Sequence, residues 1–154
     1  MIKASAVKYG FDVDPNVTLR DIADGAETAT ALETPINLNL LDAAYWQENT
    51  LPYNTLMVVI HVTETLVGTA ATYDLTLEVD DTTDLSDTPT VVASITIPSG
   101  LSAGSVFYLP VDARTIENLV SDYSGDILYM GIRATLGGSG GSITYGAWIA
   151  KNVA

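Results

Sequence analysis

The chain contains no cysteine, and this absence removes several kinds of chemistry at once. Disulfide bonds, thiolate metal sites and cysteine nucleophiles are all excluded. Histidine is almost as rare, because His61 is the only one among the 154 residues. A metal site built on histidine and cysteine has no second such ligand to recruit. The sequence therefore predicts neither a metal centre of this kind nor a thiol enzyme.

Basic residues are also scarce. Six lysines and arginines stand against 19 acidic residues, which gives a formal net charge of −13. No lysine or arginine occurs between Arg20 and Arg114. Proteins that bind nucleic acids or anionic membranes neutralise phosphates with such side chains. We therefore expect neither nucleic acid nor a membrane as a partner, and we interpret the acidity as favouring solubility.

Long apolar runs are missing too. None reaches the roughly 18 residues that a membrane-spanning helix needs. The start of the chain, MIKASAVKYGFDVD, has no apolar core of the kind found in signal peptides, so we expect no secretory signal. Hydrophobic residues nevertheless make up 47% of the chain, which is too many for a disordered protein. The length is that of one domain with its own core.

Alternation of apolar and polar residues is the strongest pattern that is present, and it is typical of half-buried strands. Between Thr72 and Val79, for example, Tyr73, Leu75 and Leu77 alternate with polar residues. We predict strands over residues 28–33, 35–41, 55–62, 72–79, 90–97, 105–111, 128–136 and 143–149. About eight short strands separated by turn residues are typical of a sandwich or barrel. The predicted fold class is therefore all-β.

Turn and helix signals organise the rest of the chain. The glycine-rich segment 137–141 lies between two predicted strands and predicts a hairpin loop. Residues 80–88 predict a polar loop, and the apolar spacing within 113–123 predicts one short helix. Residues 1–27 show little alternation, so we predict an irregular N-terminal arm, either a frayed terminus or an arm that orders against a neighbour. The β-sandwich domain is predicted over residues 28–154.

Three features resemble catalytic or ion-binding motifs but lack the context that such motifs need. Residues 137–141 fit the G-x-S-x-G pattern of serine hydrolases, yet they link two predicted strands and no histidine follows. Segment 80–87 carries four aspartates without the glycine and closing glutamate of an EF-hand, so a solvated turn and a bound cation both stay open. Asp74 and Glu78 share a strand face but do not define a glycosidase pair. We predict a protein that is not an enzyme and has no cofactor.

Four residues are candidates for an interface with another protein. Arg133 is a lone arginine on a predicted strand face, suited to a carboxylate across a subunit boundary, although a plain surface charge explains it equally well. Tyr129 shares that face. His61 ends a buried-looking strand, and we interpret it as structural or interfacial. Trp148 is an aromatic residue of the kind that anchors cores and interfaces, or that lines a sugar-binding face.

Several stretches, taken together, resemble the capsid cement (decoration) proteins of tailed phages. They are Tyr73–Asp81, Asp84–Asp87, Val91–Ser94, Leu128–Leu136, the glycine turn after it, and Ile143–Ile149. In that family a strand of alternating apolar residues runs into an acidic loop, and a late strand, a Gly/Ser/Thr turn and a last strand follow. The resemblance is one of pattern and covers roughly residues 55–152.

The resemblance implies a jelly-roll-like antiparallel β-sandwich that forms homotrimers on the outer face of an icosahedral phage head. There it would bridge subunits of the major capsid protein, so the protein would be part of the virion after assembly in the host cytoplasm. The family has no catalytic residues to transfer. Two segments depart from its usual form, namely residues 1–30, which are longer, and residues 115–125, which resemble an insertion. The alternative is a carbohydrate-binding, lectin-like sandwich of a phage tail or surface protein, which would share the strands, the tyrosines and the acidic loop.

Overall fold

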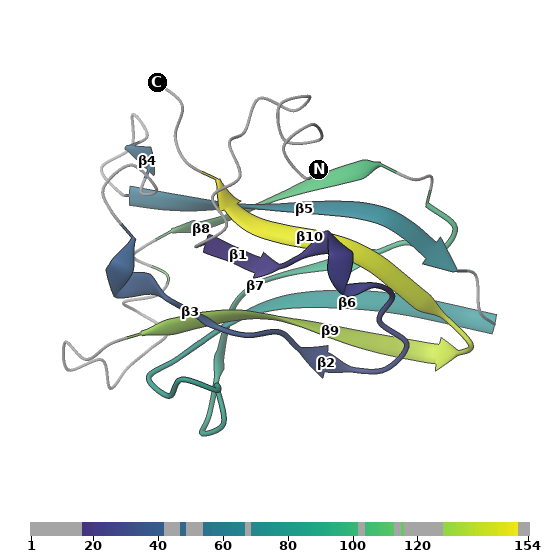
Figure 1. Cartoon of the computed structure of the whole chain (residues 1–154), viewed down its shortest axis with the longest axis horizontal. Helices are drawn as coiled ribbons and strands as arrows, with labels where there is room; N and C mark the ends of the chain where they lie inside the picture. Colours follow the sequence, from purple (N-terminus) through teal and green to yellow (C-terminus); the bar gives the residue numbers. More distant parts are fainter. Residues whose placement is uncertain are drawn as a thin grey trace.

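Two antiparallel β-sheets face each other and enclose a hydrophobic core (Figure 1). The computed structural model describes residues 17–41, 47–48, 54–66, 69–101, 104–112, 115 and 128–150. Every strand pair in this part of the chain is antiparallel. The prediction of an all-β antiparallel sandwich is therefore confirmed.

The first sheet, called sheet A, is built around its longest strand, β5. Its strands are β1 (Thr18–Arg20), β10 (Ser142–Ala150), β5 (Asn54–Leu66), β8 (Ser105–Asp112) and β4 (Gln47–Glu48). The order is β1-β10-β5, and both β8 and β4 pair with β5. Strand β8 runs along most of β5, from Thr55 to Val62, so β5 is enclosed by neighbours on both sides.

The second sheet, sheet B, is built around β9 and β6. Its strands are β2 (Ala31–Leu32), β3 (Ile36–Asn37), β9 (Tyr129–Ser139), β6 (Thr69–Asp80) and β7 (Thr90–Ile97). Both β2 and β3 pair with β9, and the order continues through β6 to β7. Two short 3-10 turns, η2 (Ile22–Asp24) and η3 (Leu38–Leu40), complete the described elements. Apart from β6 and β7, which pair within sheet B, successive long strands lie in opposite sheets, and the first and last strands are neighbours, an order typical of a jelly roll.

The core lies between the two sheets and follows the alternation in the sequence. In each long strand every second side chain points inward, because successive residues of a strand face opposite sides of its sheet. The largest fully buried side chains are Leu19, Leu56, Ile60, Tyr73, Leu75, Leu77, Ile97, Met130, Ile132, Ile143, Tyr145 and Ile149. Burial of each contributes about 1.5–3 kcal/mol, so these residues together dominate the stability of the sandwich.

The glycine-rich turn joins the two sheets and does not close a hairpin, so that prediction was wrong. Strand β9 continues to Ser139 and pairs with β6, whereas β10 pairs with β5 and β1. Gly137 lies inside β9 opposite Thr72, where a Cβ would collide with the threonine hydroxyl. Gly140 has a positive φ of 71° and forms the turn itself. The glycines therefore serve a close strand contact and a chain reversal between layers.

The predicted boundary between arm and sandwich at residue 27 was also wrong. Strand β1 pairs with β10, and Val17 and Leu19 are buried in the core, so residues 17–27 belong to the sandwich. The short apolar run around Leu19 was too brief to show alternation. Residues 1–16 lie outside the described residues, and so does the predicted helix over 113–123, except for Thr115. In the described part of the chain, no helix is long and apolar enough to cross a membrane.

Candidate interaction surfaces

The four predicted interface residues lie on two different surfaces. His61 belongs to β5 and Trp148 to β10, both in sheet A. Tyr129 and Arg133 both belong to β9 in sheet B. All four alternate with core residues along their strands, so they lie on the outer faces of the sandwich. The structure thus gathers them as two pairs, one pair on each sheet.

Trp148 is the centre of a second apolar cluster that is separate from the core between the sheets. Val59 lies opposite Trp148 on one side and opposite Tyr108 of β8 on the other. We call this surface the Trp148 face, and it comprises Met57, Val59, Val106, Tyr108, Trp148 and Ala150. An antiparallel sheet commonly packs one face on the core and solvates the other. Sheet A departs from this pattern, because it is apolar on both faces.

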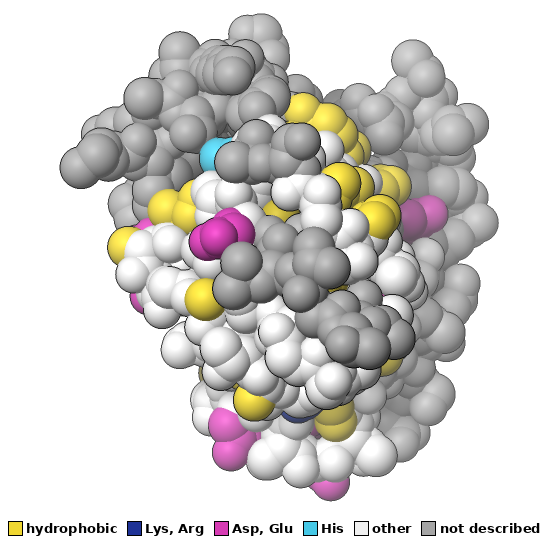
Figure 2. All heavy atoms as spheres, turned by 90° about the vertical axis from the view of Figure 1, so that its right-hand side faces the viewer, with side chains coloured by type: hydrophobic (Ala, Val, Ile, Leu, Met, Phe, Trp, Pro, Cys, Tyr) yellow, Lys and Arg dark blue, Asp and Glu magenta, His cyan; other side chains and the backbone are white. Residues whose placement is uncertain are grey.

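The strands beneath the Trp148 face carry no charged side chain over their central residues. Residues 57–61, 106–110 and 146–150 contain no aspartate, glutamate, lysine or arginine. Tyr108 is 45% exposed, and His61, which lies opposite Val106, is 7% exposed. In the end-on view of Figure 2, the histidine and several hydrophobic side chains reach the surface in the upper half. Val59, Trp148 and Ala150 at the centre of this face are at most 3% exposed, so Tyr108 is the side chain of the face that is most accessible to another protein.

Arg133 finds its carboxylate within the same chain. Its Nε and Nη2 donate to the two oxygens of Glu78 on β6, at 2.8 and 2.9 Å. The Thr76 hydroxyl also donates to Glu78, which is only 6% exposed. The hydrogen bonds to Glu78 raise the pKa of Arg133. The idea that Arg133 awaits a carboxylate across a subunit boundary therefore loses its physical basis, although its presence at an interface stays a prediction.

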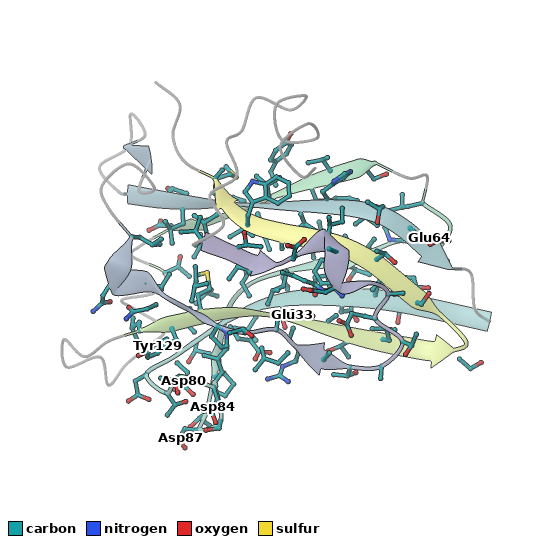
Figure 3. The ribbon with its side chains drawn as sticks, viewed as in Figure 1. Glu33, Glu64, Asp80, Asp84, Asp87 and Tyr129 are labelled. Atoms are coloured by element: carbon teal, nitrogen blue, oxygen red, sulfur yellow. The ribbon has the colours of Figure 1, made fainter. Side chains whose placement is uncertain are left out.

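Tyr129 lies beside the acidic loop, because it pairs with Asp80 at the end of β6. Figure 3 shows Tyr129 with Asp80, Asp84 and Asp87 at one end of the sandwich, far from Glu64 at the other end. The Asp80 carboxylate accepts hydrogen bonds from the Asp81 amide at 2.8 Å, the Thr82 hydroxyl at 2.8 Å and the Asp87 amide at 3.3 Å. Burial acts to raise the pKa of Asp80, but these bonds outweigh it and the pKa is lowered.

Leu85 fixes the same loop to the outer face of sheet B. It is 3% exposed within a polar segment, and its φ of 51° is unusual for a leucine. A Cβ at Gly131 of β9 would lie 2.8 Å from Leu85 Cδ1 and 3.1 Å from Leu32 Cδ1. Gly131 thus leaves the space that Leu85 occupies. The acidic loop is therefore a shaped surface anchored on sheet B, which alternation alone did not reveal.

Arg20 forms a buried cluster that sequence reasoning missed. Its side chain is fully buried; Nε donates to Glu33 and Nη2 to Glu27, each at 2.9 Å. The carbonyls of Tyr145 and Gly25 accept further bonds at 2.6 and 3.0 Å. The guanidinium also lies over the Tyr145 ring, 4.6 Å from its centroid. Arg20 thus links β1, the segment before β2, the residue after β2, and β10.

The charges of this cluster perturb one another. Burial acts to lower the pKa of Arg20, but the bonds to Glu27 and Glu33 outweigh it and raise the pKa. Burial acts to raise the pKa of Glu27, yet the bond from Arg20 lowers it overall. Burial and a hydrogen bond shared with Glu27 raise the pKa of Glu33 against the effect of Arg20. Burial also raises the pKa of the Tyr145 hydroxyl, which therefore stays protonated.

Two buried polar atoms have no hydrogen-bond partner among the described residues, the Tyr145 hydroxyl and Trp148 Nε1. The Tyr145 ring lies in the core, and Trp148 Nε1 lies on the opposite side of sheet A. Neither atom is near a set of metal ligands, because no group of three or more histidine, aspartate or glutamate residues in the described segments is arranged to hold an ion.

No protein-family model and no curated protein sequence matches this chain.

Proposed function

We propose that this chain is a structural capsid cement protein that binds the outer surface of a phage head, bridges major capsid protein subunits and stabilises the shell. In this proposal it assembles as a homotrimer in the virion. Two features support the proposal: the sequence pattern shared with cement proteins, and a sandwich whose strand order is typical of jelly rolls. Jelly rolls are common in viral capsids and lectins, so the fold suits both this function and the alternative.

The observation that carries the proposal is the Trp148 face. Sheet A is apolar on its outer side, and the strands under that side are uncharged at their centres. Copies that each carry a net charge of −13 repel one another, so a contact between them must avoid carboxylates. The uncharged strand centres meet this condition. Val59, Trp148 and Ala150 are buried within the chain, and Tyr108 at 45% exposure is the aromatic anchor that the face presents to a second copy. We therefore assign the contact between copies to this face.

Two matched substitutions test the assignment. Tyr108 and Val91 are large hydrophobic residues that are 45% and 48% exposed, on β8 of sheet A and β7 of sheet B respectively. We expect Tyr108→Asp to yield monomers, because it introduces a carboxylate into the contact, and Val91→Asp to leave the trimer intact. Light scattering after size exclusion measures both masses, and circular dichroism verifies that both variants fold. A Tyr108→Asp variant that remains a trimer would remove the Trp148 face from the proposal.

Binding to the capsid is tested with heads from which cement protein has been stripped. We expect the wild-type chain to co-sediment with such heads and to raise the temperature at which they release DNA. The heads are taken from a phage in which the gene for the major capsid protein lies next to the gene for this chain. A folded trimer that does not bind these heads would contradict the cement function.

The carbohydrate-binding alternative draws on a different surface. Tyr129 lies next to Asp80 at the end of β6. An aromatic ring can pack on the apolar face of a sugar while neighbouring carboxylates accept hydrogen bonds from its hydroxyl groups. Under this alternative the protein is a monomer whose binding to a glycan array is lost in Tyr129→Ala. Under the cement proposal the same array gives no binding that depends on Tyr129.

A further inference from the structure

Residues 17–37 form a strap that lies across the edges of both sheets. Strand β1 pairs with β10 in sheet A, and Glu27 exchanges backbone hydrogen bonds with Ile143 of the same strand at 2.8 and 3.1 Å. Strands β2 and β3 then pair with β9 in sheet B. The three strands of the strap contain only three, two and two residues. Because such short strands form few backbone hydrogen bonds, the attachment of the strap to the sandwich depends on its side chains.

The central side-chain contact of the strap is the guanidinium of Arg20. Its Nε and Nη2 donate in parallel. In an arginine these two groups usually donate to both oxygens of one carboxylate. Arg133 shows this usual arrangement with Glu78. In Arg20 the same two nitrogens donate to two different carboxylates, Nε to Glu33 and Nη2 to Glu27. The two carboxyl groups are thereby held side by side on one guanidinium, each 2.9 Å from one of its nitrogens.

The charge around Arg20 is unbalanced when both carboxyl groups are ionised. One cation then faces two anions whose side chains are each 18% exposed. Asp21 and Asp24 at the η2 turn line the same pocket and are also acidic, and the Tyr145 hydroxyl stays neutral because burial raises its pKa. The described residues contain one other arginine or lysine, Arg133, which is paired with Glu78, and the single histidine, His61, lies on the outer face of sheet A. A proton on one of the two glutamates removes the excess negative charge.

We propose that Glu27 and Glu33 hold one proton between them across Arg20, and that the strap 17–37 loosens from the sandwich when that proton leaves. The pocket beside the cluster, lined by Arg20, Asp21, Asp24 and Glu33 among others, brings solvent to the Glu33 carboxyl group. The attachment of the strap to the sandwich therefore depends on pH. The strap covers the outer edges of β9 and β10, the strands on that side of the two sheets.

The direction of the response follows from the two carboxyl groups. The pKa of Glu33 is raised above 4.5, so its contribution to the attachment is complete in acid and is lost as the pH rises through that raised pKa. The pKa of Glu27 is lowered below 4.5, so its contribution is lost only as the pH falls through that lowered pKa. The attachment is therefore strongest in mildly acidic solution and weakens toward neutral pH.

Hydrogen exchange of the wild-type protein at about pH 5 and about pH 7.5 tests the proposal, after correction for the intrinsic exchange rates. The amides of Glu27 and Glu33 are the probes, because they donate to Ile143 and Ile132 at 2.8 and 3.1 Å. We expect their protection, relative to amides of β5, to fall severalfold between the two conditions. In Glu33→Gln, which carries no charge at any pH, we expect the protection at neutral pH to equal that in mild acid.

The matched control is Glu78→Gln, which changes the same residue type where Arg133 binds a single carboxylate. We expect it to leave the pH response of the strap unchanged. Glu27→Gln provides a second test should Glu33→Gln fail to fold, since it also leaves one carboxylate for Arg20 and must abolish the response. The proposal is overturned if wild-type protection does not change with pH, or if both glutamine variants keep the wild-type response.

A titration of the side-chain carboxyl carbons by NMR gives an independent readout on the unmodified chain. We expect Glu27 and Glu33 to titrate as a coupled pair in two separated steps. Two independent titrations near the ordinary glutamate pKa would contradict the shared proton.

Discussion

Arg20 and Arg133 are the same residue type in two different environments. The side chain of Arg20 is fully buried and binds two carboxylates, whereas that of Arg133 is 30% exposed and binds one. Removing one partner of a buried ion pair leaves a charge without compensation, which costs far more than losing a pair near solvent. The two arginines should therefore differ strongly in their importance for stability.

We predict that Arg20→Met lowers the free energy of unfolding by about 3–5 kcal/mol, because Glu27 and Glu33 lose their shared cation. Arg133→Met should cost less, since it leaves one carboxylate without its cation instead of two, and the Thr76 hydroxyl still donates to Glu78. Urea unfolding followed by tryptophan fluorescence measures both values. Equal losses for the two variants would show that the Arg20 cluster has no special structural role.

Sequence reasoning could not distinguish these two arginines. Arg133 stood on a clear strand pattern, and its face was predicted correctly, but its partner Glu78 lies 55 residues away. Arg20 lies in a three-residue strand, and it bonds the Tyr145 carbonyl 125 residues away. Contacts of this kind depend on the register between strands, which a local pattern does not contain.

At the scale of elements, the long strands were the most predictable part of the molecule. Strand β7 was predicted at its observed bounds, Thr90–Ile97, and β8 to within one residue. The short strands β2 and β3 were predicted too long: β2 covers only Ala31–Leu32, and β3 ends at Asn37 because residues 38–40 turn into η3. The sheet to which a strand belongs was not predictable, and so a turn between two layers was taken for a hairpin.

The acidic loop is the element whose pH dependence can be predicted. Asp80 has a pKa lowered from 3.8, so its contribution is present above that value and is lost as the pH falls through the lowered pKa. We predict that Asp80→Asn loosens residues 81–88 already at neutral pH, at a local cost of about 1–3 kcal/mol. Hydrogen exchange of this segment measures the effect.

The control for the loop is Asp87→Asn, which makes the same change of charge but leaves the three hydrogen bonds of the Asp80 carboxylate in place. We expect the loop in this variant to keep its wild-type protection. If both variants loosened the loop equally, its order would depend on total charge and not on Asp80.

At the scale of the whole molecule, a strongly acidic sandwich carries an uncharged apolar face. The net charge of −13 opposes contact between copies, and the Trp148 face offers a surface where such contact buries no carboxylate. Salt screens the remaining repulsion, so assembly should strengthen as the ionic strength rises. The same charge distribution explains why a partner rich in phosphates is not expected.

The central claim is that this protein works by assembling, and the mass of the purified chain in solution tests it most directly. Light scattering after size exclusion, at micromolar concentration and physiological salt, should give three times the chain mass of 16.3 kDa. A mass of one chain at every concentration and salt level, together with binding to glycans, would contradict the account and favour the carbohydrate-binding alternative.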